Sequence, residues 1–223
     1  MLMGLIAEAG TLYNRTTFEE GLTTFVLEEV QNRKSRKGLK DVVLSSSLSF
    51  DCLKAGFLEK SQQLYKEAVS NSFDHISDAI LVCEDTRTVL FVEMKSECTP
   101  HNMAKARAQI VASYLKLYIH LGFFSSVQWS GYRFKGLVIS LKPTYEQKVN
   151  CEKEAAIPGR QLARFMRMLC LSTLPVPPVT SDLCEVKNLR LRSEVKDSLD
   201  IELHYYGTSA AEGETVSLDP YFM

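Results

Sequence analysis

The 223-residue chain is long enough to form one large domain or two small ones around a buried apolar core. Its composition, 45% hydrophobic and 24% charged, is typical of a globular protein and excludes an intrinsically disordered or a largely membrane-embedded chain. The formal net charge of -1 indicates no charged partner, and it argues mildly against nucleic acid because phosphate binding usually leaves a basic surface.

The first third of the chain predicts a helix, a strand and a second helix. Apolar residues at helical spacing predict a helix over residues 15–38, ending at Gly38. Residues 41–50 begin with β-branched side chains and then alternate, which is typical of a strand. Helical spacing returns over residues 53–72. The first strand therefore lies between two predicted helices.

The middle of the chain predicts two strands, a helix, a strand and a helix. Two apolar runs within residues 73–97, separated by the charged sequence "EDTR", predict a pair of strands. A proline opens and a glycine closes the strongest helical pattern, over residues 100–122. Residues 132–143 predict a further strand and residues 159–171 a further helix. This order indicates an α/β protein whose mixed central sheet is flanked by helices on both faces.

The last part of the chain is predicted to be less regular. The segment "STLPVPPVTSD" interrupts regular structure, and two apolar patterns beyond it, residues 186–197 and 199–207, suggest a final pair of strands. The end of the chain is small and polar, which is typical of a disordered tail. We therefore expect one domain over residues 1–175, a C-terminal extension over 176–206 and a disordered tail over 207–223.

The cysteines and the apolar segments predict where the protein resides. The six cysteines are scattered without a C-x-x-C pair, which argues against a zinc site and predicts reduced thiols. The first residues lack the features of a signal peptide, and no stretch reaches the roughly 18 apolar residues of a membrane span. We therefore expect an intracellular protein, cytoplasmic or nuclear, without membrane association.

Three ionisable residues stand at the outer ends of the two strands predicted within residues 73–97. Side chains alternate between the faces of a strand, so Glu93 and Lys95 share one face of the second strand. A two-residue loop within "EDTR" would pair the strands antiparallel and place Asp78 on the same face, opposite Glu93 or Lys95. We therefore expect the three side chains to converge.

Two carboxylates and a lysine in one place predict a metal site. Burying two carboxylates costs several kcal/mol unless a cation compensates. A hard divalent ion, Mg²⁺ or Mn²⁺, provides that compensation, and the lysine could position a water or neutralise charge on a phosphate oxygen. The alternative is a surface ion pair at a sheet edge without function. The apolar sequences "AILV" and "VLFV" favour the metal site, because they are typical of a strand covered on both faces.

An aspartate at the start of one strand, a hairpin-length gap and "VEMK" at the end of the next resemble the PD-(D/E)xK phosphodiesterase superfamily. The similar region covers roughly residues 15–142, and Ser77 stands where the motif has its proline. The resemblance implies a restriction-endonuclease-like fold and metal-dependent cleavage of nucleic-acid phosphodiesters.

The resemblance also implies roles for particular residues. Asp78 and Glu93 match the metal-binding carboxylates, and the backbone carbonyl of Met94 would be a further metal ligand. Lys95 matches the catalytic lysine of the motif. Gln109 corresponds to a glutamine that many members carry on the following helix, and we include it among the catalytic residues.

Many members have a further metal-binding glutamate on the first helix. Glu20 is the first choice here, and the sequence leaves three alternatives open, namely Glu19, Glu28 and Glu67.

The sequence thus predicts a Mg²⁺- or Mn²⁺-dependent nuclease that acts on DNA in preference to RNA and could form a homodimer or join a larger protein complex. Three basic residues on the helix over 100–122 are expected to contact phosphates of the nucleic acid, namely Lys105, Arg107 and Lys116. The alternative is a catalytically inactive module of the same fold, which would bind nucleic acid or a protein partner. A small-molecule enzyme of another fold is disfavoured because the sequence lacks a Gly-rich phosphate loop and a G-x-S-x-G motif.

Overall fold

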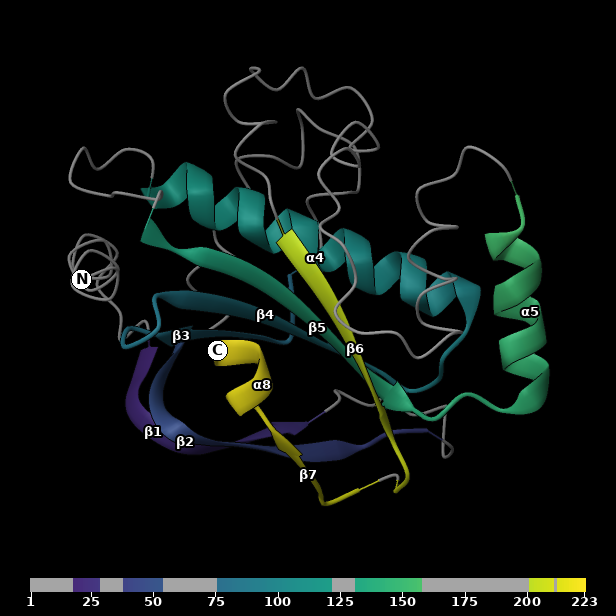
Figure 1. Ribbon diagram of the computed structural model, residues 1–223, viewed down its shortest axis with the longest axis horizontal. Coiled ribbons are helices and arrows are strands. Elements are labelled where there is room, and N and C mark those ends of the chain that lie inside the picture. Colours follow the sequence, from purple (N-terminus) through teal and green to yellow (C-terminus); the bar gives the residue numbers. More distant parts are fainter. Residues whose placement is uncertain (1–17, 29–37, 54–75, 122–130, 158–200, 211) are drawn as a thin grey trace.

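The computed structural model describes residues 18–28, 38–53, 76–121, 131–157, 201–210 and 212–223 (Figure 1). These residues form seven strands and three helices. The strands are β1 (Phe18–Glu28), β2 (Asp41–Leu53), β3 (Ala79–Cys83), β4 (Thr88–Lys95), β5 (Arg133–Leu141), β6 (Ile201–Thr208) and β7 (Glu214–Ser217). The helices are α4 (Pro100–Leu121), α5 (Tyr145–Ala155) and α8 (Asp219–Phe222).

The strands form one mixed sheet in the order β1-β2-β3-β4-β5-β6, with β7 beside β2. Neighbours from β1 to β4 are antiparallel, whereas β4, β5 and β6 are parallel, as are β2 and β7. Parallel neighbours need a crossover connection, and α4 lies in the connection between β4 and β5. The predicted α/β class with a mixed central sheet is confirmed.

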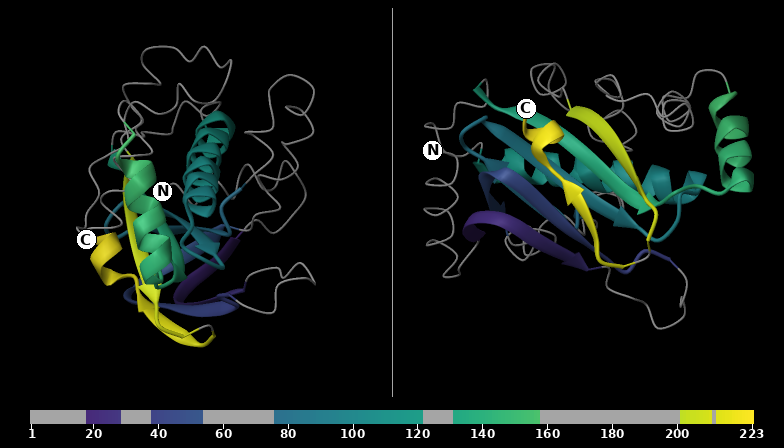
Figure 2. Two further views of the ribbon diagram at one scale, coloured as in Figure 1. Left: turned by 90° about the vertical axis from the view of Figure 1, so that its right-hand side faces the viewer. Right: turned by 60° about the horizontal axis from the view of Figure 1, so that its bottom comes forward.

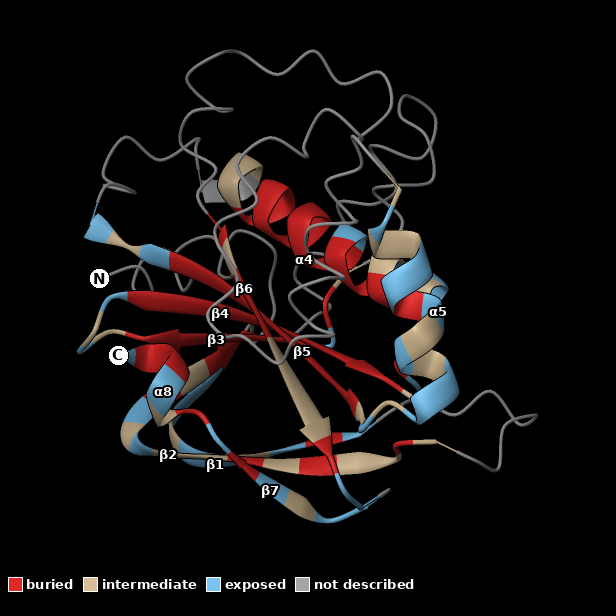
Figure 3. Ribbon diagram, turned by 45° about the vertical axis from the view of Figure 1, so that its right-hand side comes forward, coloured by how far each residue is buried: buried red, intermediate tan, exposed pale blue. Residues whose placement is uncertain are grey.

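The central strands are buried on both faces (Figure 3). On one face, Tyr114 of α4 packs against the rings of Phe91 and Phe134, with centroids 6.2 and 4.8 Å away. On the other face, Leu81 and Phe222 belong to an apolar core that includes residues of β2, β5 and α8. The helices α4 and α8 therefore lie on opposite faces of the sheet (Figure 2). Among the helices of the described residues, none combines the length and the apolarity that crossing a membrane would require.

The helix predicted over residues 15–38 is wrong, because its described part is the strand β1. The pairing of β1 with β2 is irregular on both sides of Leu22, and Gly21 adopts a φ of 66° there. Irregularities of this kind interrupt the alternation of a strand. Leu22, Phe25 and Leu27 all pack on the core, and the three-residue step from Leu22 to Phe25 is one that a helical stripe also has.

The end of the chain, predicted to be disordered, instead contains β7 and α8. Val216, Leu218, Tyr221 and Phe222 are buried, and β7 pairs with β2. These apolar residues are separated by polar ones in the sequence, so the segment looked too polar to fold. In the structure they cover the face of the sheet opposite α4.

Three further helices and two further strands differ in how the structure bears on them. The helix α5 was not predicted, although Thr144 and Gln147 form a capping box that marks its start. The helix predicted over 53–72 overlaps β2 at its first residue and otherwise lies outside the described residues, as do the predicted helix over 159–171 and strand over 186–197. The strand predicted over 199–207 is confirmed as β6.

Candidate functional site

The strands β3 and β4 form the predicted hairpin, with a longer loop than expected. Pairing ends at Cys83 and Thr88, so residues 84–87 form a four-residue loop where the sequence predicted two. Since both loop lengths are even, the side chains of β3 and β4 that share a face of the sheet are the same ones as with the predicted loop. The register continues from the last pair to Asp78, immediately before β3, opposite Glu93 on β4. The sequence left Glu93 and Lys95 as alternatives opposite Asp78, and in the structure the residue opposite Asp78 is Glu93.

Glu93 is the most unusual group at this end of the hairpin. The residue is 1% exposed, and its Oε1 accepts a hydrogen bond from Lys95 Nζ. Within the described part of the chain, its Oε2 is a buried oxygen without a hydrogen-bond partner. Burial and, to a smaller extent, the negative charge of Asp78 together raise the pKa of Glu93 to about 8, against the effect of Lys95. An unpaired buried carboxylate oxygen is costly, so this group favours a proton or a bound cation.

Asp78 is the solvent-exposed carboxylate of the site, and we call the side on which it lies the open side. The residue is exposed, and its Oδ2 accepts a hydrogen bond from the backbone N–H of Met94 at 2.7 Å. Desolvation by surrounding protein raises the pKa of Asp78, while the Met94 N–H and the charges of Lys95 and Lys105 lower it. Because the residue is exposed, solvent limits this rise. The N–H of Met94, rather than its carbonyl, is the group that contacts Asp78.

Lys95 connects the hairpin to α4. The residue is 9% exposed, and its Nζ donates to Glu93 and to Oε1 of Gln109, the latter at 2.8 Å. Gln109 in turn donates from Nε2 to the carbonyl of Ile76 at 3.2 Å. The structure therefore brings together Asp78, Glu93, Lys95 and Gln109, the four residues predicted as catalytic.

A fifth polar residue at this place was missed from the sequence. Ser113 lies four residues after Gln109, on the same side of α4, and its Oγ accepts a hydrogen bond from the N–H of Ser77 at 2.7 Å. The four-residue spacing of Gln109 and Ser113 on a buried helix face is the sequence feature from which it could be predicted. Its partner, 36 residues earlier in the chain, gave no signal.

The glutamate predicted on the first helix does not join the site. Glu20, Glu19 and Glu28 are exposed residues of β1, and Glu67 lies outside the described residues. β1 is separated from β4 by two strands, which corresponds to about 14 Å along the sheet. The structure places the three described residues away from the hairpin end, because the element that carries them is a strand at the sheet edge.

The three basic residues of α4 differ in their surroundings. Lys105 is exposed, and its charge acts on Asp78. Arg107 and Lys116 are 6% and 0% exposed, and each has an interaction within the protein. Their burial does not fit the predicted contact with phosphates, whereas Lys105 could make such a contact at the open side.

The donor set of the site suits a hydrated Mg²⁺ or Mn²⁺. The described residues contain no group of three or more His, Cys, Asp or Glu side chains that could hold a metal ion. Zinc would need about four such ligands in a structural site, whereas Mg²⁺ keeps several waters and binds through one or two carboxylates. Asp78 and Glu93 supply two carboxylates, one exposed and one with a buried oxygen that has no hydrogen-bond partner among the described residues. These residues fit the predicted cation, with water completing its shell.

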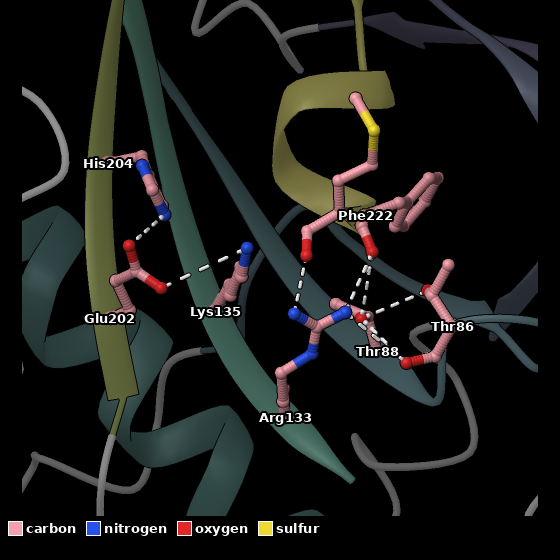
Figure 4. A network of polar contacts seen from close by, with 8 residues as sticks. Thr86, Thr88, Arg133, Lys135, Glu202, His204 and Phe222 are labelled. Atoms are coloured by element: carbon pink, nitrogen blue, oxygen red, sulfur yellow. Dashed lines mark hydrogen bonds and ion pairs between the residues drawn. The ribbon is translucent and has the colours of Figure 1, made fainter.

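A second polar cluster lies on the face of the sheet that α8 covers, opposite the face that α4 covers (Figure 4). Lys135 and His204 flank Glu202, with Lys135 Nζ 3.9 Å and His204 Nε2 3.3 Å from its carboxylate oxygens. Burial lowers the pKa of Lys135 and of His204. Nearby, Arg133 donates a hydrogen bond to the carbonyl of Phe222 at 3.2 Å. This part of the sheet anchors α8 and is separate from Asp78.

Comparison with protein-family models, with curated proteins and with solved structures gives no match to this chain. The residues of the site are therefore the basis for inferring what the protein does.

Proposed function

We propose that this protein is a Mg²⁺- or Mn²⁺-dependent nuclease of the restriction-endonuclease-like type, which cleaves DNA in preference to RNA. The observation that carries the proposal is the pair of opposed carboxylates: Glu93 keeps a buried oxygen without a hydrogen-bond partner among the described residues, and Asp78 lies opposite it on the open side. Two such carboxylates next to a buried lysine are costly in a structural role and suited to a cation.

The chain's own residues divide the work of such a reaction. A hard divalent ion at this site would polarise the phosphodiester and lower the pKa of a bound water. Asp78 and Glu93 would hold the ion. Among the described residues Lys95 donates to Glu93 and Gln109, and its third N–H would serve an attacking water or a phosphate oxygen. Gln109 would hold the ammonium group in place for that role.

The order of elements supports the proposed fold. The β3–β4 hairpin carries the acidic residues at one end, α4 follows, and β5 returns parallel to β4. β1 departs from this pattern, since a strand stands where the resemblance implies a helix. The likeness to the proposed fold is therefore confined to the hairpin, α4 and β5.

Cleavage assays test the proposal directly. Purified protein is incubated with single- and double-stranded DNA and RNA in Mg²⁺, Mn²⁺ or EDTA. Cleavage should require the metal and fall by at least about a hundredfold in Asp78→Asn, Glu93→Gln and Lys95→Met. Glu152→Gln, which removes an exposed carboxylate on α5, serves as the control and should cleave like the wild type. Undiminished cleavage in all three site variants would remove this site from consideration.

The burial of Glu93 and Lys95 against each other also favours the alternative, a catalytically inactive module of the same fold. Such a module would bind nucleic acid or a protein partner without cutting. Nucleic-acid binding without metal-dependent cleavage would identify it.

A further inference from the structure

A single peptide group is held from both sides by α4. The carbonyl of Ile76 accepts a hydrogen bond from Gln109 Nε2 at 3.2 Å, and the N–H of Ser77 donates to Ser113 Oγ at 2.7 Å. This carbonyl and this N–H belong to the same peptide unit, and they point in opposite directions because the unit is planar and trans. Gln109 and Ser113 are one helical turn apart, so they reach its two ends.

The held peptide group immediately precedes Asp78. Asp78 continues from Ser77 and places its carboxylate on the N–H of Met94 at 2.7 Å. Gln109 also accepts from Lys95 Nζ at 2.8 Å. One helix thereby fixes the backbone before Asp78 and the side chain of Lys95 at the same time.

The hydroxyl group of Ser113 is buried, where a polar group lowers the stability of the fold unless it is hydrogen-bonded. The residue is 0% exposed, and its neighbours in the helix, Ala112 and Tyr114, are also buried. A buried hydroxyl is unfavourable unless it forms hydrogen bonds, and the N–H of Ser77 would be left unsatisfied without it. A proline in place of Ser77 could not form this bond, since it has no N–H.

From this geometry we infer that Ser113 is a positioning residue for Asp78: it fixes the peptide between Ile76 and Ser77 so that the Asp78 carboxylate lies against β4, opposite Glu93. The consequence for metal binding rests on the proposed function. The position of Asp78 does not, and it can be measured without metal.

Amide hydrogen exchange measured by NMR in the metal-free protein tests the position. In Ser113→Ala, exchange of the Ser77 and Met94 amides should accelerate about tenfold or more, because Ser77 loses its acceptor and Asp78 no longer stays on Met94. Asp78→Ala gives the exchange rate of the Met94 amide without its acceptor. Ser113→Thr keeps the hydroxyl and should restore protection of both amides.

Thr88→Val is the matched control. Thr88 is 0% exposed, at the loop end of the same hairpin, and its hydroxyl donates to the carbonyl of Phe222 at 3.2 Å. This variant also loses one buried hydroxyl, but it should leave the Ser77 and Met94 amides protected. Wild-type protection of Met94 in Ser113→Ala, or equal acceleration in Thr88→Val, overturns the inference.

Titration with Mn²⁺, followed by calorimetry, separates this inference from the proposed function. If the wild type binds Mn²⁺, Ser113→Ala should bind it about tenfold more weakly, while Ser113→Thr and Thr88→Val bind like the wild type. Equal affinity of Ser113→Ala and the wild type overturns the metal-binding part of the inference and leaves the proposed function standing. Failure of the wild type to bind counts against the proposed function, and the exchange of Met94 then decides the role of Ser113.

Discussion

The backbone N–H of Met94 donates a hydrogen bond to the carboxylate of Asp78 at 2.7 Å. The strand that carries Glu93 and Lys95 therefore also holds the aspartate that lies opposite them. This contact makes the end of the hairpin a single unit whose members are expected to respond together to pH, to metal and to substitution.

We predict that the metal-free protein loses stability as the pH rises from about 5 to 8. The pKa of Glu93 is raised to about 8 in the folded state, above the 4.5 of an ordinary glutamate. In this range the folded state retains a proton that the unfolded chain has released, so a higher pH favours unfolding, by up to about 1.4 kcal/mol per pH unit. Asp78, whose pKa is also raised, acts in the same direction. Urea denaturation in EDTA at several pH values gives the free energy of unfolding as a function of pH. This free energy should fall less steeply with pH in Glu93→Gln than in the wild type, and an equally steep fall in both would contradict the prediction.

Divalent metal should stabilise the folded protein through the two carboxylates. An ion that binds the folded state at 100 times its dissociation constant adds about 2.7 kcal/mol to the free energy of unfolding. The melting temperature of the wild type should therefore rise with Mn²⁺, and those of Asp78→Asn and Glu93→Gln should not. Glu152→Gln, with its exposed carboxylate removed, should respond like the wild type. A rise that persists in both site variants would place the ion elsewhere.

Loss of Lys95 alone should destabilise the protein more than loss of Lys95 and Glu93 together. Above the raised pKa of Glu93, at about pH 9, Lys95→Met leaves the buried carboxylate without its charged partner and is expected to cost about 3 kcal/mol. At that pH, adding Glu93→Gln removes the unpaired charge and should recover part of that loss. Chemical denaturation of both single variants and the double variant gives the coupling free energy, and strictly additive effects would show that the two side chains do not interact.

The buried end of the chain should contribute strongly to stability. Phe222 is 0% exposed and packs on Phe50, with ring centroids 5.8 Å apart. Phe222→Ala should lower the free energy of unfolding by about 3 kcal/mol or more. The adjacent Met223 is 71% exposed, so Met223→Ala should change it by less than about 0.5 kcal/mol. Similar effects of the two substitutions in thermal denaturation would mean that α8 does not dock as described.

The sequence predicted the elements whose patterns are unambiguous. The hairpin was found because two wholly apolar runs flank a short charged turn, and the shared face of Asp78 and Glu93 depends on loop parity rather than loop length. The helix α4 was found from its long regular spacing. These two elements carry the four side chains that the structure brings together.

The remaining features depend on contacts between distant parts of the chain. The bulges around Leu22 arise from pairing with β2, and without that partner the spacing of β1 resembles a helix. The buried positions of Val216 and Phe222 exist because a sheet is present to receive them. The bond between Ser77 and Ser113 likewise joins two elements that only the fold brings together. Local pattern contains no information about such partners.

The parallel pairing of β2 with β7 has a consequence for how the protein reaches its native state. It joins segments about 170 residues apart, as the bond from the N–H of Gly213 to Asp41 illustrates. During synthesis, at roughly 5 to 20 residues per second, the first half of β2 would wait about 10 to 30 s for this neighbour. In that interval the edge of β2 offers unpaired backbone groups to other chains. Aggregation of nascent or truncated chains should therefore begin at this edge, and chaperone binding there would protect the growing protein.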